Sequence, residues 1–281
     1  MEAQSRNSIL CPNCRRLVSI DEERCPHCGL GHPGSRWKNI SIGRGLFASD
    51  RIVTNIIALN VGMFVLSVLI NPGSIGFSAN PLHFLSPSTR SLISLGATGT
   101  FPIARFHTWW SFLSANYLHG SILHILFNMI ALWQIGPLVV QEYGVYRMFS
   151  IYTLSGIGGF VISYLAGIPL TIGASAAICG LIGAALYFGK SRGGQYGQMV
   201  YHQIIGWLVA IFVFGFLVSG INNWAHGAGV VCGVLAGYLL GYQERKAENF
   251  YHKVLGVSCG VATIGVLAWS VFWSLLALGY L

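Results

Sequence analysis

Charge is what this sequence has least of. Asp, Glu, Lys and Arg together make up 9% of the 281 residues, whereas about 25% is usual in soluble domains. Hydrophobic residues make up 54%, and the mean hydropathy is +0.63. This composition excludes a soluble enzyme, a secreted disulfide scaffold and a coiled coil. It predicts an all-α polytopic membrane protein surrounded by a lipid bilayer.

Acidic residues are almost absent from the middle of the chain. Between Asp50 and Glu244 the only one is Glu142. This shortage excludes an intramembrane aspartyl dyad, an HExxH zinc protease and a complete Ser-His-Asp triad within the bilayer. It also argues against a proton-coupled transporter, which needs buried carboxylates. A catalytic site in this region would therefore have to use serine and histidine.

Seven apolar runs are long enough, or nearly so, to cross a bilayer as helices. The first fifty residues are polar and show no secretory signal, so we expect the N-terminus in the cytoplasm and the C-terminus outside. Fourteen basic residues then fall in cytoplasmic segments and two, Arg90 and Arg105, in outer ones, which is a strong positive-inside bias. We expect a multi-pass protein of the cell (inner) membrane. The runs are 52–70, 117–140, 148–167, 174–189, 203–218, 225–241 and 254–278.

Two CxxC pairs near the N-terminus, CPNC and CPHCG, predict a structural zinc site. Its ligands would be Cys11, Cys14, Cys25 and Cys28, in a zinc ribbon over residues 1–36 followed by a linker over 37–50. Disulfides, redox use, or His27 and His32 as substitute ligands remain alternatives. Four thiolates leave no open position on the metal, so we expect no catalytic cofactor. The ribbon would recruit a cytoplasmic protein partner, and nucleic acid is not expected.

Polar side chains inside apolar runs are costly in lipid and are therefore candidates for function. Ser175 and His226 form a possible nucleophile and base, because neutral histidine can remove a hydroxyl proton. His124 and Asn128 stand four residues apart on one helix face and could stabilise an oxyanion. His119 lies one turn or so before His124. At ~1.5 Å per residue, Ser175 and His226 lie at similar depths below the outer surface.

Small residues would allow the helices that carry this pair to touch. Gly229, Gly233, Gly237 and Gly241 recur at every fourth residue of the sixth run. Ala176, Gly180 and Ala184 form a similar stripe on the fourth run. Small-residue stripes let membrane helices approach closely, so we expect the two stripes to face each other.

The candidate residues fall in three motifs, HGSILHILFN, GASA followed by AICGLIG, and AHGAGVVCG. In these motifs the sequence resembles the rhomboid intramembrane serine proteases, and the resemblance covers residues 51 to about 242. The resemblance implies a six-span catalytic domain at 51–243, with 244–281 adding a cytoplasmic turn and a seventh span. It implies that Ser175 is the nucleophile, His226 the base, and Asn128 and His124 oxyanion donors, with His119 in the water-accessible pocket. The substrates would be transmembrane proteins, cleaved near their outer ends through an acyl-enzyme.

Three positions differ from the usual residues of that family, namely Ala176 after the serine, Cys179 one turn later and Ser111 after Trp110. One competing interpretation is an inactive rhomboid-like protein that binds transmembrane helices and recruits a partner through its ribbon. A small-solute transporter is a third. Serine-directed labelling distinguishes the protease from both.

Overall fold

A computed structural model of the chain describes residues 8–11, 16–27, 31–34, 51–71, 84–218 and 220–279. By internal contacts the chain divides into two compact units, Met1–Ala48 and Ser49–Leu281. The first unit contains both CxxC pairs of the sequence, and the second contains all seven apolar runs.

The described part of the first unit contains a short antiparallel β-hairpin. Strand β1, Ser8–Leu10, pairs with β2, Leu17–Ser19, with Ile9 opposite Val18. Cys11 and Cys25 are buried with Val18 in a small core. Two of the four predicted zinc ligands are therefore placed in one cluster. The other two, Cys14 and Cys28, lie outside the described residues.

The second unit is helical, as the composition predicts. Its described residues include seven helices of eighteen residues or more, and each overlaps one of the seven apolar runs. Five of these helices, α3, α7, α8, α10 and α12, are long and apolar enough to cross a membrane. The bounds are α3 Ile52–Leu69, α7 Ile122–Tyr143, α8 Val145–Leu165, α9 Ser175–Arg192, α10 Gly194–Leu217, α11 Asn223–Leu240 and α12 Phe250–Leu278.

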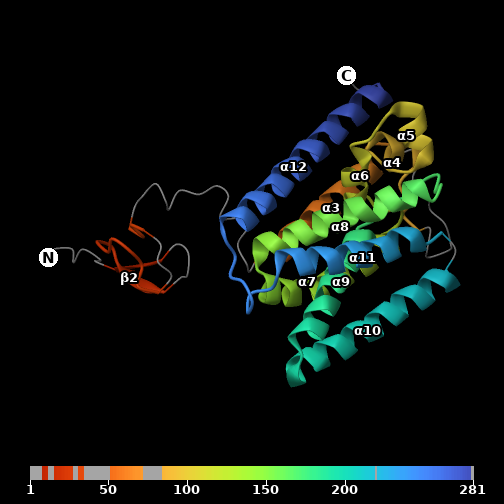
Figure 1. Cartoon of the computed structure of the whole chain (residues 1–281). Helices are drawn as coiled ribbons and strands as arrows, with labels where there is room; N and C mark the ends of the chain where they lie inside the picture. Colours follow the sequence, from red (N-terminus) through yellow and green to blue (C-terminus); the bar gives the residue numbers. More distant parts are fainter. Residues whose placement is uncertain are drawn as a thin grey trace. The chain divides into compact units, whose positions relative to one another are not determined.

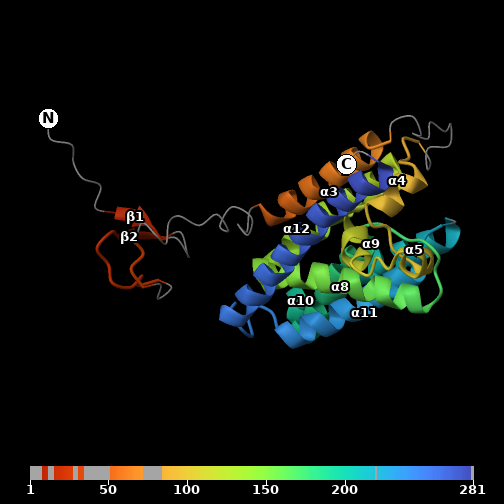
Figure 2. The same cartoon turned by 90° about the horizontal axis from the view of Figure 1, so that it is seen from above.

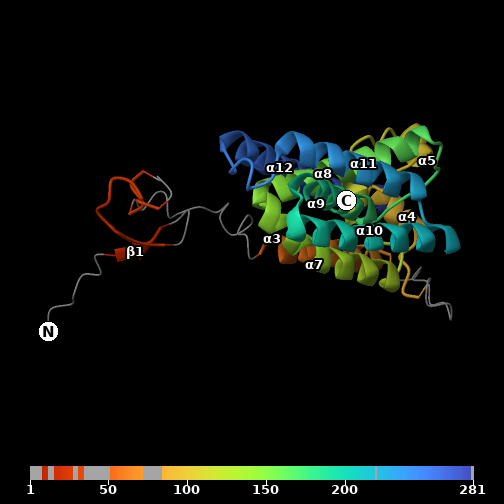
Figure 3. The same cartoon turned by 60° about the horizontal axis from the view of Figure 1, so that its bottom comes forward.

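Helix α9 lies at the centre of the second unit, because it packs against α7, α8, α10 and α11 (Figures 1 and 3). Helix α11 packs on both α8 and α9, on the side of the unit away from α3 (Figure 2). Protein rather than lipid therefore surrounds much of α9. The many glycine and alanine residues of α9 suit this position, because small residues let the surrounding helices pack closely against it.

The described part of the long connection between α3 and α7 contains four short helices. Two of them, α4 and α6, pack beside α12, and the hydroxyls of Ser94 on α4 and Ser274 on α12 are 2.7 Å apart. The prediction that the second span begins at residue 117 is wrong, because α7 begins only at Ile122. Ser121 caps it by accepting a hydrogen bond from the backbone N–H of His124. The short helices are α4 Thr89–Ser94, α5 Thr100–Phe106, α6 Ser111–Ser114 and η3 Ala115–Tyr117.

Glycines place two further helix boundaries at positions that the apolar runs did not predict. Gly193 and Gly194 both have φ near +65°, and α10 begins within this turn, at Gly194, instead of at residue 203. Its first turns are polar, so a search for apolar residues misses them. Gly241 has φ +69° and ends α11 as its C-cap, so it does not continue the glycine stripe as expected.

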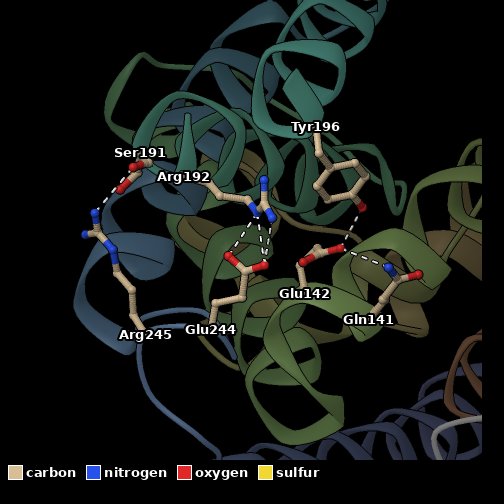
Figure 4. A network of polar contacts seen from close by, with 7 residues as sticks. All are labelled: Gln141, Glu142, Ser191, Arg192, Tyr196, Glu244 and Arg245. Atoms are coloured by element: carbon tan, nitrogen blue, oxygen red, sulfur yellow. Dashed lines mark hydrogen bonds and ion pairs between the residues drawn. The ribbon is translucent and has the colours of Figure 1, made fainter. Parts of the chain in front are cut away.

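A polar network ties together the ends of four segments at the C-terminal end of α9 (Figure 4). The Arg192 guanidinium donates to both carboxylate oxygens of Glu244 at 2.9–3.0 Å. The Tyr196 hydroxyl donates to the Glu142 carboxylate at 2.7 Å. These contacts fix the ends of α7, α9 and α10 and the segment after α11. We call this the far end of the unit, since Ser175 is at the other end of α9.

Candidate active site

The structure brings Ser175 and His226 together. The Nε2 atom of His226 lies 2.8 Å from the Oγ atom of Ser175, which is hydrogen-bond distance. Ser175 is the first residue of α9, and His226 lies in the first turn of α11. Within the described chain, Nδ1 of His226 has no hydrogen-bond partner. Among the described residues, no carboxylate therefore stands behind the histidine.

The two small-residue stripes interlock and set this distance. A Cβ atom on Gly229 would collide with the carbonyl oxygen of Ala176, and one on Gly233 would collide with the backbone of Gly180. One on Gly237 would lie 3.2 Å from the Cα atom of Ala184. The predicted contact between the stripes is therefore confirmed for three of the four glycines. Backbone contact along both helices allows short Ser175 to reach His226.

His124 points one ring nitrogen towards the serine. Its Nδ1 atom accepts a hydrogen bond from the backbone N–H of Gly120 at 3.2 Å. Because Nδ1 is an acceptor, the neutral ring carries its proton on Nε2. A Cβ atom built on Gly173 would lie 2.7 Å from that Nε2 and 3.7 Å from Ser175 Oγ. The Nε2 N–H of His124 and the hydroxyl of Ser175 therefore both lie beside Gly173.

Gly173 places no side chain between these two groups. Its φ is +124°, a conformation that side chains rarely adopt, and its backbone N–H donates to the carbonyl of Ala115 at 2.9 Å. A side chain at this position would collide with the His124 ring, because its Cβ atom would lie 2.7 Å from Nε2 and 2.9 Å from Cε1. Glycine at this position therefore lets the loop pass close to His124.

Asn128 and His119 complete the predicted set. Asn128 is buried one turn after His124 and donates one amide hydrogen to the His124 carbonyl at 2.9 Å. Its second amide hydrogen is free to bind another acceptor. His119 is fully buried, and its ring centre lies 5.0 Å from that of His124. All five predicted residues of the second unit therefore come from the same end of the bundle.

The three departures from the family pattern are accommodated by neighbouring residues. The methyl group of Ala176 lies where Gly159 of α8 has no side chain, since a Cβ there would be 2.9 Å away. Cys179 is buried against Gly229. The buried Ser111 hydroxyl donates to Thr98 Oγ1 at 2.9 Å. None of the three intrudes between Ser175 and His226.

Sequence reasoning missed Gly120, which orients His124 through its backbone N–H. A signal was present, because Gly120 follows a histidine and directly precedes the Ser121 cap of α7. A glycine immediately before a helix cap often marks a tight turn whose N–H groups point towards the first helical residues. The backbone contact itself cannot be read from the residue types.

Comparison with known proteins gives a family match over this part of the chain. Residues 107–243 match the family described as Rhomboid domain. The chain is 35% identical to Rhomboid protease GluP of Bacillus subtilis over 170 residues, which cover 60% of this chain and 33% of GluP. RHOMBOID-like protein 4 of Arabidopsis thaliana is 30% identical over 202 residues, or 66% of this chain and 51% of that protein. Rhomboid-like protease 5 of Toxoplasma gondii is 28% identical over 163 residues, covering 57% and 19%.

These matches support the rhomboid family for the second unit. Together with the five apolar helices, they identify a multi-pass integral membrane protein. The chain spans about a third of GluP and about half of the plant relative. The dyad, His124, Asn128 and Gly173 all fall within the matched rhomboid domain.

Proposed function

We propose that this protein is an intramembrane serine endopeptidase that cleaves transmembrane protein substrates near their outer ends. The observation that carries the proposal is the 2.8 Å contact between His226 Nε2 and Ser175 Oγ. Relatives that are named proteases support it. The five candidate membrane-spanning helices around the site support substrates that themselves lie in the bilayer.

The reaction would follow the usual path of serine acyl transfer. Ser175 Oγ attacks the scissile carbonyl carbon while His226 Nε2 takes the hydroxyl proton. The oxyanion receives hydrogen bonds from His124 Nε2, the free amide hydrogen of Asn128 and the Ser175 backbone N–H. His226 then protonates the leaving amine, and water hydrolyses the acyl-enzyme with the same histidine as base.

Two features fit Ser175 for this role. It stands at the start of α9, where backbone N–H groups have no partner within the helix and the dipole favours negative charge. Its side chain is only half-buried, so water can reach it for deacylation. His119, fully buried beside His124, would line the inner wall of the pocket.

The test is labelling by a fluorophosphonate together with cleavage of a transmembrane reporter. We expect wild type to be active and Ser175→Ala and His226→Ala to lose both signals. Ser191→Ala, at the far end of α9, and His202→Ala, exposed on α10, are matched controls that should remain active. Activity that survives in the Ser175 and His226 variants would refute the dyad. A folded wild type with neither labelling nor cleavage would favour the helix-binding alternative.

We also propose the predicted seven-span topology, with the N-terminus and far end in the cytoplasm of a cell whose inner membrane holds the protein. Lys190, Arg192, Arg245 and Lys246 all lie at or next to the far end, which suits the cytoplasmic side. Single cysteines placed at Arg105 and Arg245 test this. A membrane-impermeant thiol reagent should label intact cells at residue 105 only, and labelling at 245 would reverse the orientation.

The zinc ribbon remains a proposal, supported by the burial of Cys11 and Cys25 in one small core. Zinc bound by these two with Cys14 and Cys28 would stabilise a segment too small to fold alone. Purified wild type should contain one zinc ion per chain, and Cys11→Ser with Cys25→Ser should contain none. The ribbon would recruit a cytoplasmic protein, so deletion of residues 1–36 should preserve cleavage while changing partner binding.

A further inference from the structure

The side chain of Asn222 is outside the proposed catalytic set, and it connects the helix that carries His226 with the segment that leads to Ser175. Asn222 immediately precedes α11, and its Oδ1 accepts a hydrogen bond from the Ala225 backbone N–H at 3.1 Å. Its Nδ2 donates to Ser163 Oγ at 2.5 Å and to Thr171 Oγ1 at 3.0 Å. A single amide therefore makes hydrogen bonds to three different segments, namely the start of α11, helix α8 and the loop before α9.

The acceptor end of Asn222 fixes the start of the histidine helix. Its side chain caps α11, and its backbone carbonyl accepts from the His226 N–H at 3.2 Å. His226 is thus one turn from the cap, so the direction of its ring depends on how α11 begins.

The donor end reaches the segment that leads into the serine. Thr171 lies four residues before Ser175 and is buried. It forms a two-way backbone bridge with Thr98, with N···O distances of 3.1 and 2.7 Å. The segment is therefore held on one side by backbone bonds and on the other by the Asn222 amide. Ser163, fully buried near the end of α8, anchors the same amide to a third element.

We propose that Asn222 is a positioning residue that keeps the histidine helix and the serine loop in register. This rests on the proposed function of Ser175 and His226. The amide acts through these two residues and does not touch the reacting atoms. Without the bridge, the start of α11 and the loop at Thr171 are free to shift independently, which lengthens the hydrogen bond between His226 and Ser175.

The neighbouring asparagine provides a natural control. Asn223 Nδ2 donates at 3.0 Å to the carbonyl of Gly215, at the end of α10. It therefore links α11 to α10, and none of its described bonds reaches the serine loop or α8. Asn222 and Asn223 differ in what they connect, although both are half-buried at the same helix start.

The Asn222→Ser variant distinguishes the capping role of Asn222 from its bridging role. Ser88 and Ser121 already cap α4 and α7 in this chain by accepting from the N–H three residues on. Asn222→Ser should therefore preserve the cap, but its shorter side chain cannot span to Thr171 and Ser163. Asn222→Ala removes both functions. Thr171→Val removes one partner of the bridge while keeping side-chain shape.

We expect Asn222→Ser to lower kcat for a transmembrane reporter about tenfold or more, with KM within about twofold and the melting temperature close to wild type. Asn222→Ala should show the same loss of kcat and a lower melting temperature. Thr171→Val should lower kcat, and adding it to Asn222→Ser should cause no further loss. Asn223→Ser should keep kcat near wild type. An Asn222→Ser variant with wild-type kcat, or an equal loss in Asn223→Ser, would overturn the proposal.

Measuring Ser175→Ala in parallel distinguishes a failure of the proposed function from a failure of the positioning role of Asn222. Cleavage that persists in Ser175→Ala defeats the proposed function, whereas cleavage lost there but unchanged in Asn222→Ser defeats only the positioning role. Amide hydrogen exchange decides the positioning role independently of activity. Residues 169–177 should exchange faster in Asn222→Ser than in Asn223→Ser, and equal exchange would contradict the bridge.

Discussion

Replacing Gly233 by alanine should separate Ser175 from His226, the proposed nucleophile and base, without changing either residue. Gly233 lies two turns after His226 on α11, where it contacts the backbone of Gly180 on α9. A Cβ atom there would lie 2.7 Å from the Gly180 Cα atom and would also collide with the Gly180 carbonyl, whereas ordinary contact begins near 3.4 Å. Backbone cannot rotate away as a flexible side chain can.

The size of the effect follows from these distances. The tightest contact of that Cβ atom would be 1.9 Å to the Gly180 carbonyl oxygen, so restoring ordinary contact near 3.4 Å requires α9 and α11 to separate by about 1.5 Å. A similar shift at the pair would lengthen the 2.8 Å contact between Ser175 and His226 to about 4.3 Å, beyond a hydrogen bond. Misplacement of that order costs up to ~10²-fold in rate. Overpacking of this kind costs roughly 1–3 kcal/mol of stability.

The assay is reporter cleavage at equal concentrations of folded protein, with melting temperature measured alongside. Gly62→Ala in α3 is the matched control, because a Cβ there meets nothing within 4 Å. We expect kcat/KM to fall about 10- to 100-fold in Gly233→Ala and to stay near wild type in Gly62→Ala. If Gly233→Ala folds normally and keeps full activity, contact between the two stripes does not set the dyad distance.

Three further changes test other parts of the structure. His124→Ala should lower kcat about 10²- to 10³-fold with little change in KM, since it removes a donor proposed to act on the oxyanion; a rise in KM alone would contradict that role. Burial raises the pKa of Glu248 despite two backbone N–H donors at the start of α8, so its protonation favours the folded state. Wild-type melting temperature should therefore fall relative to Glu248→Gln as pH rises through that raised pKa, and parallel curves would refute this. Ser274→Ala should cost about 0.5–1.5 kcal/mol by removing the hydrogen bond to Ser94, and Ser94→Ala with Ser274→Ala should be less than additive.

The general architecture could be predicted because hydrophobicity and helix length are properties of the sequence alone. A long helix overlaps each of the seven runs, and the scarcity of acidic residues leaves serine and histidine as the candidate chemistry. Boundaries were predicted less well where polar residues continue a helix. The start of α10 at Gly194 and the start of α7 after Ser121 are set by backbone turns and a cap, not by apolarity.

What the sequence determined by itself is a set of residue types and their spacing along each helix: a serine, three histidines, an asparagine and two small-residue stripes. Their relation across helices was decided by tertiary packing. Glycine permits close approach but does not specify a partner, and only the contact of α9 with α11 makes 2.8 Å between Ser175 and His226 possible. The proton position on His124 and the bridging role of Asn222 depend on hydrogen bonds to Gly120, Ser163 and Thr171, which come from separate segments. A hydrogen bond requires its donor and acceptor to lie about 3 Å apart, so these bonds form only when folding brings the separate segments together.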